Sequence, residues 1–211
     1  MRSLKIPKLA FLLAATAFGV GCNLIIPGVI LMGPPTKKVD AEFARLSGKR
    51  VVVLVWAAPG LLSKYPYARY DIAKYVADEL RSEIEDVHTV SVDRVEREIL
   101  SRPHESGEPG EIGRKFEADI VVYLELLRYQ MRLPESSHLF RGEISASVTV
   151  FDLTEFMDKP VRYDLTAASV IHPEGAPISV YNTTEQKVRK ETSEIFAETV
   201  ALRFKSHRVE I

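Results

Sequence analysis

The sequence predicts an α/β (α+β) domain built on a single mixed β-sheet with helices packed on it. Three observations favour this class. The continuous apolar run Arg50–Trp56, rich in β-branched residues, is typical of a strand covered on both faces. In Tyr70–Asp86, apolar residues recur every fourth position, as on one face of a helix. Ile144–Val150 alternates strictly, as does a strand with one buried face.

The first half of the domain is predicted to alternate strands and helices. Ala57–Pro66, with two prolines and a glycine, is expected to be a loop leading from the first strand into the Tyr70–Asp86 helix. A short strand is expected at His88–Val92. A second helix follows, in which Val95 and Ile99 lie one turn apart.

The second half is predicted to end in a hairpin and a helix. The remaining elements are a polar loop, a short helix, three strands and a final helix, at Pro103–Gly110, Glu111–Ala118, Asp119–Leu127, Ile144–Val150, Val161–Ile171 and Thr184–Lys205. The last two strands are expected to pair antiparallel through the turn Thr154–Pro160. The order is β-α-β-α-α-β-β-β-α, in which helix-linked strands precede a hairpin and imply a mixed sheet.

The first 22 residues have the layout of an export signal. Arg2, Lys5 and Lys8 give a positive start. The apolar stretch Leu9–Val20 follows, and small residues lead to Cys22. This pattern is typical of a cleaved signal. Its apolar run is also shorter than the roughly 20 residues that a membrane-spanning helix needs.

Cys22 is the only cysteine of the chain and directly follows Gly19-Val20-Gly21. This resembles the bacterial lipobox, in which a signal peptidase cuts before a cysteine whose thiol carries diacylglycerol and acyl chains such as palmitate. Val20 and Gly21 fit the motif, whereas an aliphatic residue is expected at Gly19. Cys22 is therefore the predicted lipidation site; the alternatives are a small core cysteine or an ordinary signal cleaved nearby. A lone cysteine excludes an intramolecular disulfide.

The chain is predicted to divide into a signal peptide (1–21), a lipid anchor with linker (22–40) and one α/β domain (41–211). The apolar stretch Leu24–Met32 is too short to span a membrane, and Gly33–Lys38 is typical of a stiff, solvated linker. Asn23, rather than aspartate, follows the cysteine, which favours a periplasm-facing location on the outer membrane over the inner one. The domain is long enough for one sizeable core.

The charge balance argues against a nucleic-acid partner. Without Arg2, Lys5 and Lys8, 25 basic residues remain against 29 acidic ones, a net charge of −4. No basic excess is left to neutralise a phosphate backbone. We therefore expect the partners to be a membrane, through the lipid, and an envelope protein.

One segment of the domain resembles a known family. In Ile112-Gly113-Arg114-Lys115-Phe116-Glu117-Ala118-Asp119-Ile120-Val121-Val122, a short helix steps into a strand. This step, the strand Val51–Val55 and the order of elements are similar to envelope lipoproteins with the fold of the TolB N-terminal domain. Relatives include curli-secretion lipoproteins and lipoprotein activators of penicillin-binding proteins. The resemblance implies that fold over about residues 48–205 and is compatible with an oligomer. The short turn Thr154–Pro160 departs from the long barrel-forming hairpins of the curli-secretion proteins, so pore formation is not expected.

No residue pattern in the chain predicts catalysis, a cofactor or a metal. The histidines are scattered, with no two at i, i+3 or i, i+4 as a local zinc pair would require, and are expected at the surface: His88, His104, His138, His172 and His207. The sequence has no Gly-x-Ser-x-Gly, phosphate-binding glycine loop or Cys/His couple. We therefore do not expect an enzyme.

Two groups of residues are candidates for a partner surface. They are Tyr65, Tyr67, Arg69 and Tyr70 at the loop-to-helix junction, and Leu139, Phe140 and Arg141 between two strands. Tyrosine and arginine often anchor protein interfaces. The alternative is packing: Tyr65 and Tyr67 fold over the end of the sheet, and Asp71 caps the helix.

These features favour a non-catalytic adaptor or assembly lipoprotein for an envelope complex, such as a transporter, a secretion system or the cell-wall synthesis machinery. Two alternatives stay open. A small-ligand-binding lipoprotein would need an enclosed apolar pocket of a few hundred Å³. A cell-wall glycan hydrolase would need two carboxylates that face each other across a cleft.

Overall fold

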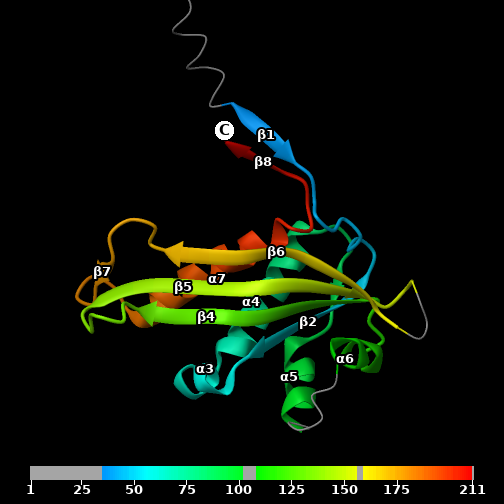
Figure 1. Ribbon diagram of the computed structural model, residues 1–211, viewed down its shortest axis with the longest axis horizontal. Helices are drawn as coiled ribbons and strands as arrows, with labels where there is room; N and C mark the ends of the chain where they lie inside the picture. Colours follow the sequence, from blue (N-terminus) through cyan, green and yellow to red (C-terminus); the bar gives the residue numbers. More distant parts are fainter. Residues whose placement is uncertain (1–34, 102–107, 156–158, 211) are drawn as a thin grey trace, which may run out of the picture. The chain divides into compact units, whose positions relative to one another are not determined.

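The computed structural model describes residues 35–101, 108–155 and 159–210 (Figure 1). Two compact units are present. One contains the strand pair β1 (Thr36–Val39) and β8 (His207–Glu210), and the other spans Asp40–His207. The predicted signal peptide, the Cys22 anchor, the Leu24–Met32 segment and His104 lie outside the described residues.

The larger unit contains the predicted mixed sheet, which has six strands rather than the five expected. Its strands are β2 (Arg50–Ala57), β3 (His88–Thr89), β4 (Ile120–Arg132), β5 (Leu139–Asp152), β6 (Val161–His172) and β7 (Ile178–Ser179). The order is β3-β2-β4-β5-β6, with β7 paired to β5. The strand β2 pairs in parallel with β3 and β4, whereas β4-β5 and β5-β6 are antiparallel. Parallel strands need crossover connections, and the helices between β2 and β4 provide them.

Helices cover both faces of the sheet. They are α3 (Pro59–Lys64), α4 (Ala68–Glu83), α5 (Val92–Ser101), α6 (Pro109–Lys115) and α7 (Glu185–Ala201). The main core packs α4 and α7 on one face, and a smaller core packs α5 and α6 against β2 and β4 on the other (Figure 1). The smaller core reaches Phe151 near the end of β5 and includes no residue of β6. No helix in the described part of the chain is long and apolar enough to cross a membrane.

Two segments for which the sequence predicts no helix or strand form one. The loop predicted at Ala57–Pro66 is wrong, because Pro59–Lys64 forms the helix α3. Pro59 occupies the first turn, where its missing N–H is not needed, and the leucines that follow it pack against the core. Within the predicted linker, Thr36–Val39 pairs with the C-terminal strand as β1.

The step from α6 into β4 explains the motif that resembles the envelope lipoproteins. Gly113 packs so closely on the β5–β6 hairpin that a Cβ would lie 2.7 Å from Cδ1 of Leu153. Glu117 ends the helix in the left-handed conformation, with φ 53°. The carboxylate of Asp119 then accepts the backbone N–H of Arg50 at 2.8 Å, which fixes the start of β4 against β2.

The edge strand β6 is blocked at its centre. Thr166 and Ala167 form a bulge opposite β5. Their outward backbone groups are bound by side chains: Glu42 accepts the N–H of Thr166 at 2.7 Å, and Arg203 donates to both carbonyl oxygens. A bulge with bound side chains prevents another strand from pairing at this point.

Candidate functional site

Tyr65 and Tyr67 lie in different environments. The ring of Tyr65 packs edge-on against Tyr129 at 5.1 Å between centroids, on the main core. Tyr67 is the N-cap residue of α4 and is 70% exposed. Asp71 lies in the first turn of α4 and is not the cap, so that part of the packing alternative is wrong. Only Tyr67 of this pair presents its ring to solvent.

Arg69 and Tyr70 join α4 to α5. The guanidinium of Arg69 donates two hydrogen bonds to the carboxylate of Glu96, at 3.1 and 2.5 Å, and both side chains are mostly buried. The hydroxyl of Tyr70 donates to Asp93 at 2.9 Å. These two side chains hold the helices that flank β2, and Arg69 also lines the groove described below.

The side chains of the second predicted group, Leu139, Phe140 and Arg141, are partly or fully buried. Phe140 is 3% exposed, so its ring cannot contact a partner, and Arg132 stacks over it at 4.5 Å. Leu139 is half-buried. Arg141 donates to the carbonyl oxygen of Glu174 at 3.2 Å. Phe140 is therefore excluded as a surface residue, because it fills the end of the β5 ladder.

An apolar groove of about 840 Å³ opens at the carboxyl end of β2. Its apolar walls come from β2, α3, α5, α6 and β4, and are formed by Trp56, Leu62, Ile99, Leu100, Ile112 and Tyr123. We call it the β2 groove. It exists because the smaller core buries Leu54 but does not extend to Trp56, the next residue on the same face of β2.

Large apolar side chains in and beside the β2 groove are exposed. Trp56 is 43% exposed and Leu100 is 63% exposed. Leu127 is also 63% exposed and continues this face along β4. It lies two residues after Glu125, which pairs with Trp56 in the sheet. Single exposed apolar residues are ordinary, but a contiguous group marks an interaction site.

Among the described residues near the β2 groove, the side chains that carry an unpaired charge are acidic. The side chains of Glu125, beside Trp56, and of Glu108 and Glu111, at the start of α6, make no hydrogen bond or ion pair within residues 35–101, 108–155 and 159–210. Burial, and then the charge of Glu125, raise the pKa of Tyr123 above its usual range.

Sequence reasoning missed this surface. Its clearest signal is Glu125, the only charge in the otherwise apolar strand segment Ile120–Leu127. In a strand covered on both faces, such a charge indicates that one face is open at that point. The residues that α5 and α6 contribute to the groove carry no local pattern that would identify them.

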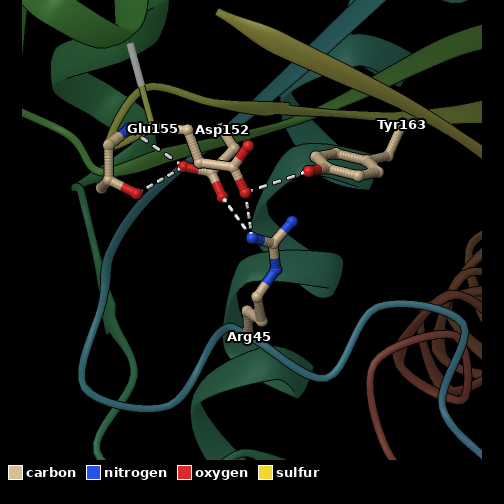
Figure 2. Close-up of polar contacts among 5 residues, drawn as sticks. Arg45, Asp152, Glu155 and Tyr163 are labelled. Carbon is tan, nitrogen blue, oxygen red and sulfur yellow. Dashed lines mark hydrogen bonds and ion pairs between the residues drawn. The ribbon is translucent and has the colours of Figure 1, made fainter. Parts of the chain in front are cut away.

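A polar cluster ties the chain before β2 to the β5–β6 hairpin (Figure 2). Nη1 of Arg45 binds Glu155 and lies 3.5 Å from the carboxylate of Asp152, which is 2% exposed. Tyr163 donates to Glu155 at 3.1 Å, and Thr154 donates twice to Asp152. The hydrogen bond to Glu155 raises the pKa of Arg45 above its ordinary value. One guanidinium thus neutralises two carboxylates, an arrangement that fixes a turn.

The histidines of the described chain are not gathered. His88 and His138 are exposed, and His172 lies 3.2 Å from Glu191. No group of three or more His, Cys, Asp or Glu side chains that could hold a metal ion occurs among the residues described.

Tyr129 gives a pH-dependent prediction. Its hydroxyl is buried beside Ser193 but makes no hydrogen bond of ordinary geometry in the described structure, and burial raises its pKa. Because the folded pKa lies above the unfolded value of about 10, this group lowers the stability only as the pH rises above that value. Tyr129→Phe should therefore reduce the loss of stability above about pH 10, and raise the free energy of unfolding at neutral pH by about 1 kcal/mol.

Urea unfolding at neutral and alkaline pH measures both effects. Tyr181→Phe is the control, because Tyr181 is 87% exposed and its change should alter neither value. A Tyr129→Phe protein that is clearly less stable at neutral pH would show that the hydroxyl is bonded in the folded protein.

No protein-family model matches the sequence, and no curated protein matches it either. Several solved structures are similar. The PelC dodecamer of Paraburkholderia phytofirmans matches with a TM-score of 0.44 and 9% identity, over 81% of this chain and 98% of that one. The lipoprotein GNA1162 of Neisseria meningitidis matches with a TM-score of 0.41 and 12% identity, over 72% of this chain and 97% of that one. The hypothetical protein CT253 of Chlamydia trachomatis matches with a TM-score of 0.41 and 15% identity, over 73% of this chain and 96% of that one. With TM-scores below 0.5, these similarities do not indicate what this chain binds or does.

Proposed function

We propose that this chain is a lipid-anchored lipoprotein of the bacterial cell envelope whose domain is a non-catalytic adaptor for an envelope protein. The β2 groove is the observation that carries the adaptor role. The export signal that ends at Cys22 supports the anchor, periplasm-facing and on the outer membrane. The order of the elements supports kinship with lipoproteins that have the TolB N-terminal fold.

The shape of the β2 groove favours a protein over a small molecule. A small-ligand site encloses most of its ligand. In the β2 groove, by contrast, Trp56 and Leu100 remain about half or more exposed, and Leu127 extends the apolar face beyond the groove. Tryptophan and tyrosine in a desolvated pocket are the residues that most often dominate the binding energy of protein interfaces.

The blocked edge of β6 supports docking through side chains. At Thr166 and Ala167, the backbone groups that an added strand would use are already bound by Glu42 and Arg203. A strand added to β6 at this point would have to displace these two side chains. The β2 groove needs no such rearrangement.

Photo-crosslinking in intact cells tests the adaptor role. A photoreactive amino acid at Trp56 or Leu127 should give one discrete crosslinked product with an envelope protein, because both side chains would lie in the interface. The control position is Ile171 on β6, which is 41% exposed against 43% for Trp56 and lies outside the groove. It should give no such product.

The substitution Trp56→Ala should remove the product formed from Leu127, because it takes away the largest contact in the β2 groove. Its exposed position makes large destabilisation unexpected, and circular dichroism checks this. Equal crosslinking from Ile171 and Trp56, or none from any position, would contradict the adaptor role.

A further inference from the structure

We infer that the β2 groove takes a protein segment that presents apolar side chains around a lysine or arginine, and that the basic group pairs with Glu125. This inference rests on the proposed adaptor function and names the chemistry of its partner. It follows from the position of Glu125, from its lack of a cation and from the acidic rim of the groove.

Glu125 lies beside the β2 groove rather than in its lining, and with Tyr123 it borders a smaller hollow over β4, β5 and β6 that Arg162 and Asp164 also line. In the sheet it pairs with Trp56 of β2 on one side and with Ser147 of β5 on the other. Tyr123 precedes it on the same face of β4, and Leu127, which lies in a β-bulge, follows it on the exposed side of the strand. Glu125 is itself half-buried. A carboxylate in such surroundings loses part of its hydration without gaining a protein partner.

The cations near Glu125 are already engaged. Arginines of the groove, of the hollow beside Glu125 and of β4 are paired with other acids: Arg69 with Glu96, Arg162 with Asp164, and Arg128 with Glu143. No hydrogen bond or ion pair reaches the side chain of Glu125 from any residue that the structure describes. The folded chain therefore leaves this carboxylate free for a cation from outside.

The described rim of the groove also carries negative charge. Glu108 lines the groove and Glu111 follows it on α6, and both are exposed. Together with Glu125 they give a negative field over an apolar floor. Such a field attracts a basic segment and repels an acidic segment or an anionic lipid surface. A second copy that presented this same face would bring like charges together.

Trp56 provides a direct readout, because it is the only tryptophan of the chain and lies in the groove. The probe is a set of three synthetic amphipathic peptides with identical apolar positions and with lysine, glutamine or glutamate at the polar ones. The full lipoprotein is placed in phosphatidylcholine vesicles, which carry no net charge. The lysine peptide should change the emission of Trp56 saturably and bind about tenfold more tightly than the glutamine peptide. High salt should remove much of this difference.

Charge variants locate the effect. Glu125→Gln should weaken binding of the lysine peptide about tenfold and leave that of the glutamine peptide unchanged. The matched control is Glu174→Gln, which removes the same charge from the exposed loop after β6 and should change neither affinity. Lysine and glutamine peptides of equal affinity, a Glu125→Gln protein that binds as the parent does, or no response of Trp56 to any peptide would overturn the inference.

The crosslinking experiment separates this inference from the proposed function. If the product formed at Trp56 in cells persists unchanged in a Glu125→Lys protein, the adaptor role stands and the basic partner group is contradicted. If the parent protein gives no product at Trp56, the adaptor role itself is contradicted. Loss of the product in Glu125→Lys but not in Glu174→Lys supports both.

Discussion

A Cys22→Ser chain is expected to lose its acyl chains and with them its attachment to the membrane. The predicted anchor is a diacylglycerol on the thiol of Cys22, and a serine hydroxyl cannot accept the same transfer in the lipobox reaction that the motif resembles. Each buried CH₂ contributes about 0.8 kcal/mol to membrane binding, and two acyl chains are needed for stable anchoring. Removal of the thiol should therefore change the distribution from membrane-bound to unbound, rather than weaken it slightly.

Incorporation of labelled palmitate and separation of membrane from soluble fractions measure this change. To avoid retention by an uncut signal, Cys22→Ser is placed behind a leader that an ordinary signal peptidase cleaves. The matched control is Gly19→Leu with Cys22 intact, which restores the aliphatic residue that the lipobox expects and should remain labelled and bound. A Cys22→Ser protein that is processed and fractionates as the parent does would exclude the anchor.

Gly142→Ala is expected to destabilise the domain by about 3 kcal/mol through overpacking. Gly142 lies on β5 under α7, where a Cβ would lie 2.8 Å from Cβ of Thr192. Thr192 is fully buried and donates to the carbonyl oxygen of Val188 at 2.6 Å, so its side chain is held in place. The added methyl group can be accommodated only if helix and sheet move apart.

Urea unfolding of a matched set tests this contact. Thr192→Ala in the Gly142→Ala background removes both γ atoms of the threonine and should restore part of the lost stability, although the two Cβ atoms remain close. Gly175→Ala is the control, because nothing lies within 4 Å of its added Cβ, and it should change the stability little. A Gly142→Ala protein as stable as the control would contradict the packing of α7 on β5.

The sheet and its main helices could be predicted because each carries a local pattern. The apolar run of β2, the four-residue spacing of α4 and the alternation of Ile144–Val150 are direct consequences of what each element buries. Where a strand continues with a weaker pattern, its predicted end falls short of the observed one. The strand β4 extends to Arg132, past the expected end at Leu127, because Tyr129 and Met131 continue the buried side after a bulge.

The remaining features depend on contacts between distant segments. Thr36–Val39 forms a strand only because residues 207–210 pair with it. Phe140 is of a residue type that is common in interfaces, but Arg132 and the surrounding chain bury it. Arg45 reaches its carboxylates across about 110 residues of sequence. The β2 groove likewise joins six elements, and no single one of them shows it.

The anchor at Cys22 is the claim on which the account of a membrane-tethered adaptor most depends. The measurement that tests it most directly is the mass of the amino-terminal peptide of the mature protein, isolated from cell membranes. A lipid-anchored protein should give a peptide that begins at Cys22 and carries a diacylglycerol. An unmodified peptide that begins upstream or downstream of Cys22 would contradict the anchor.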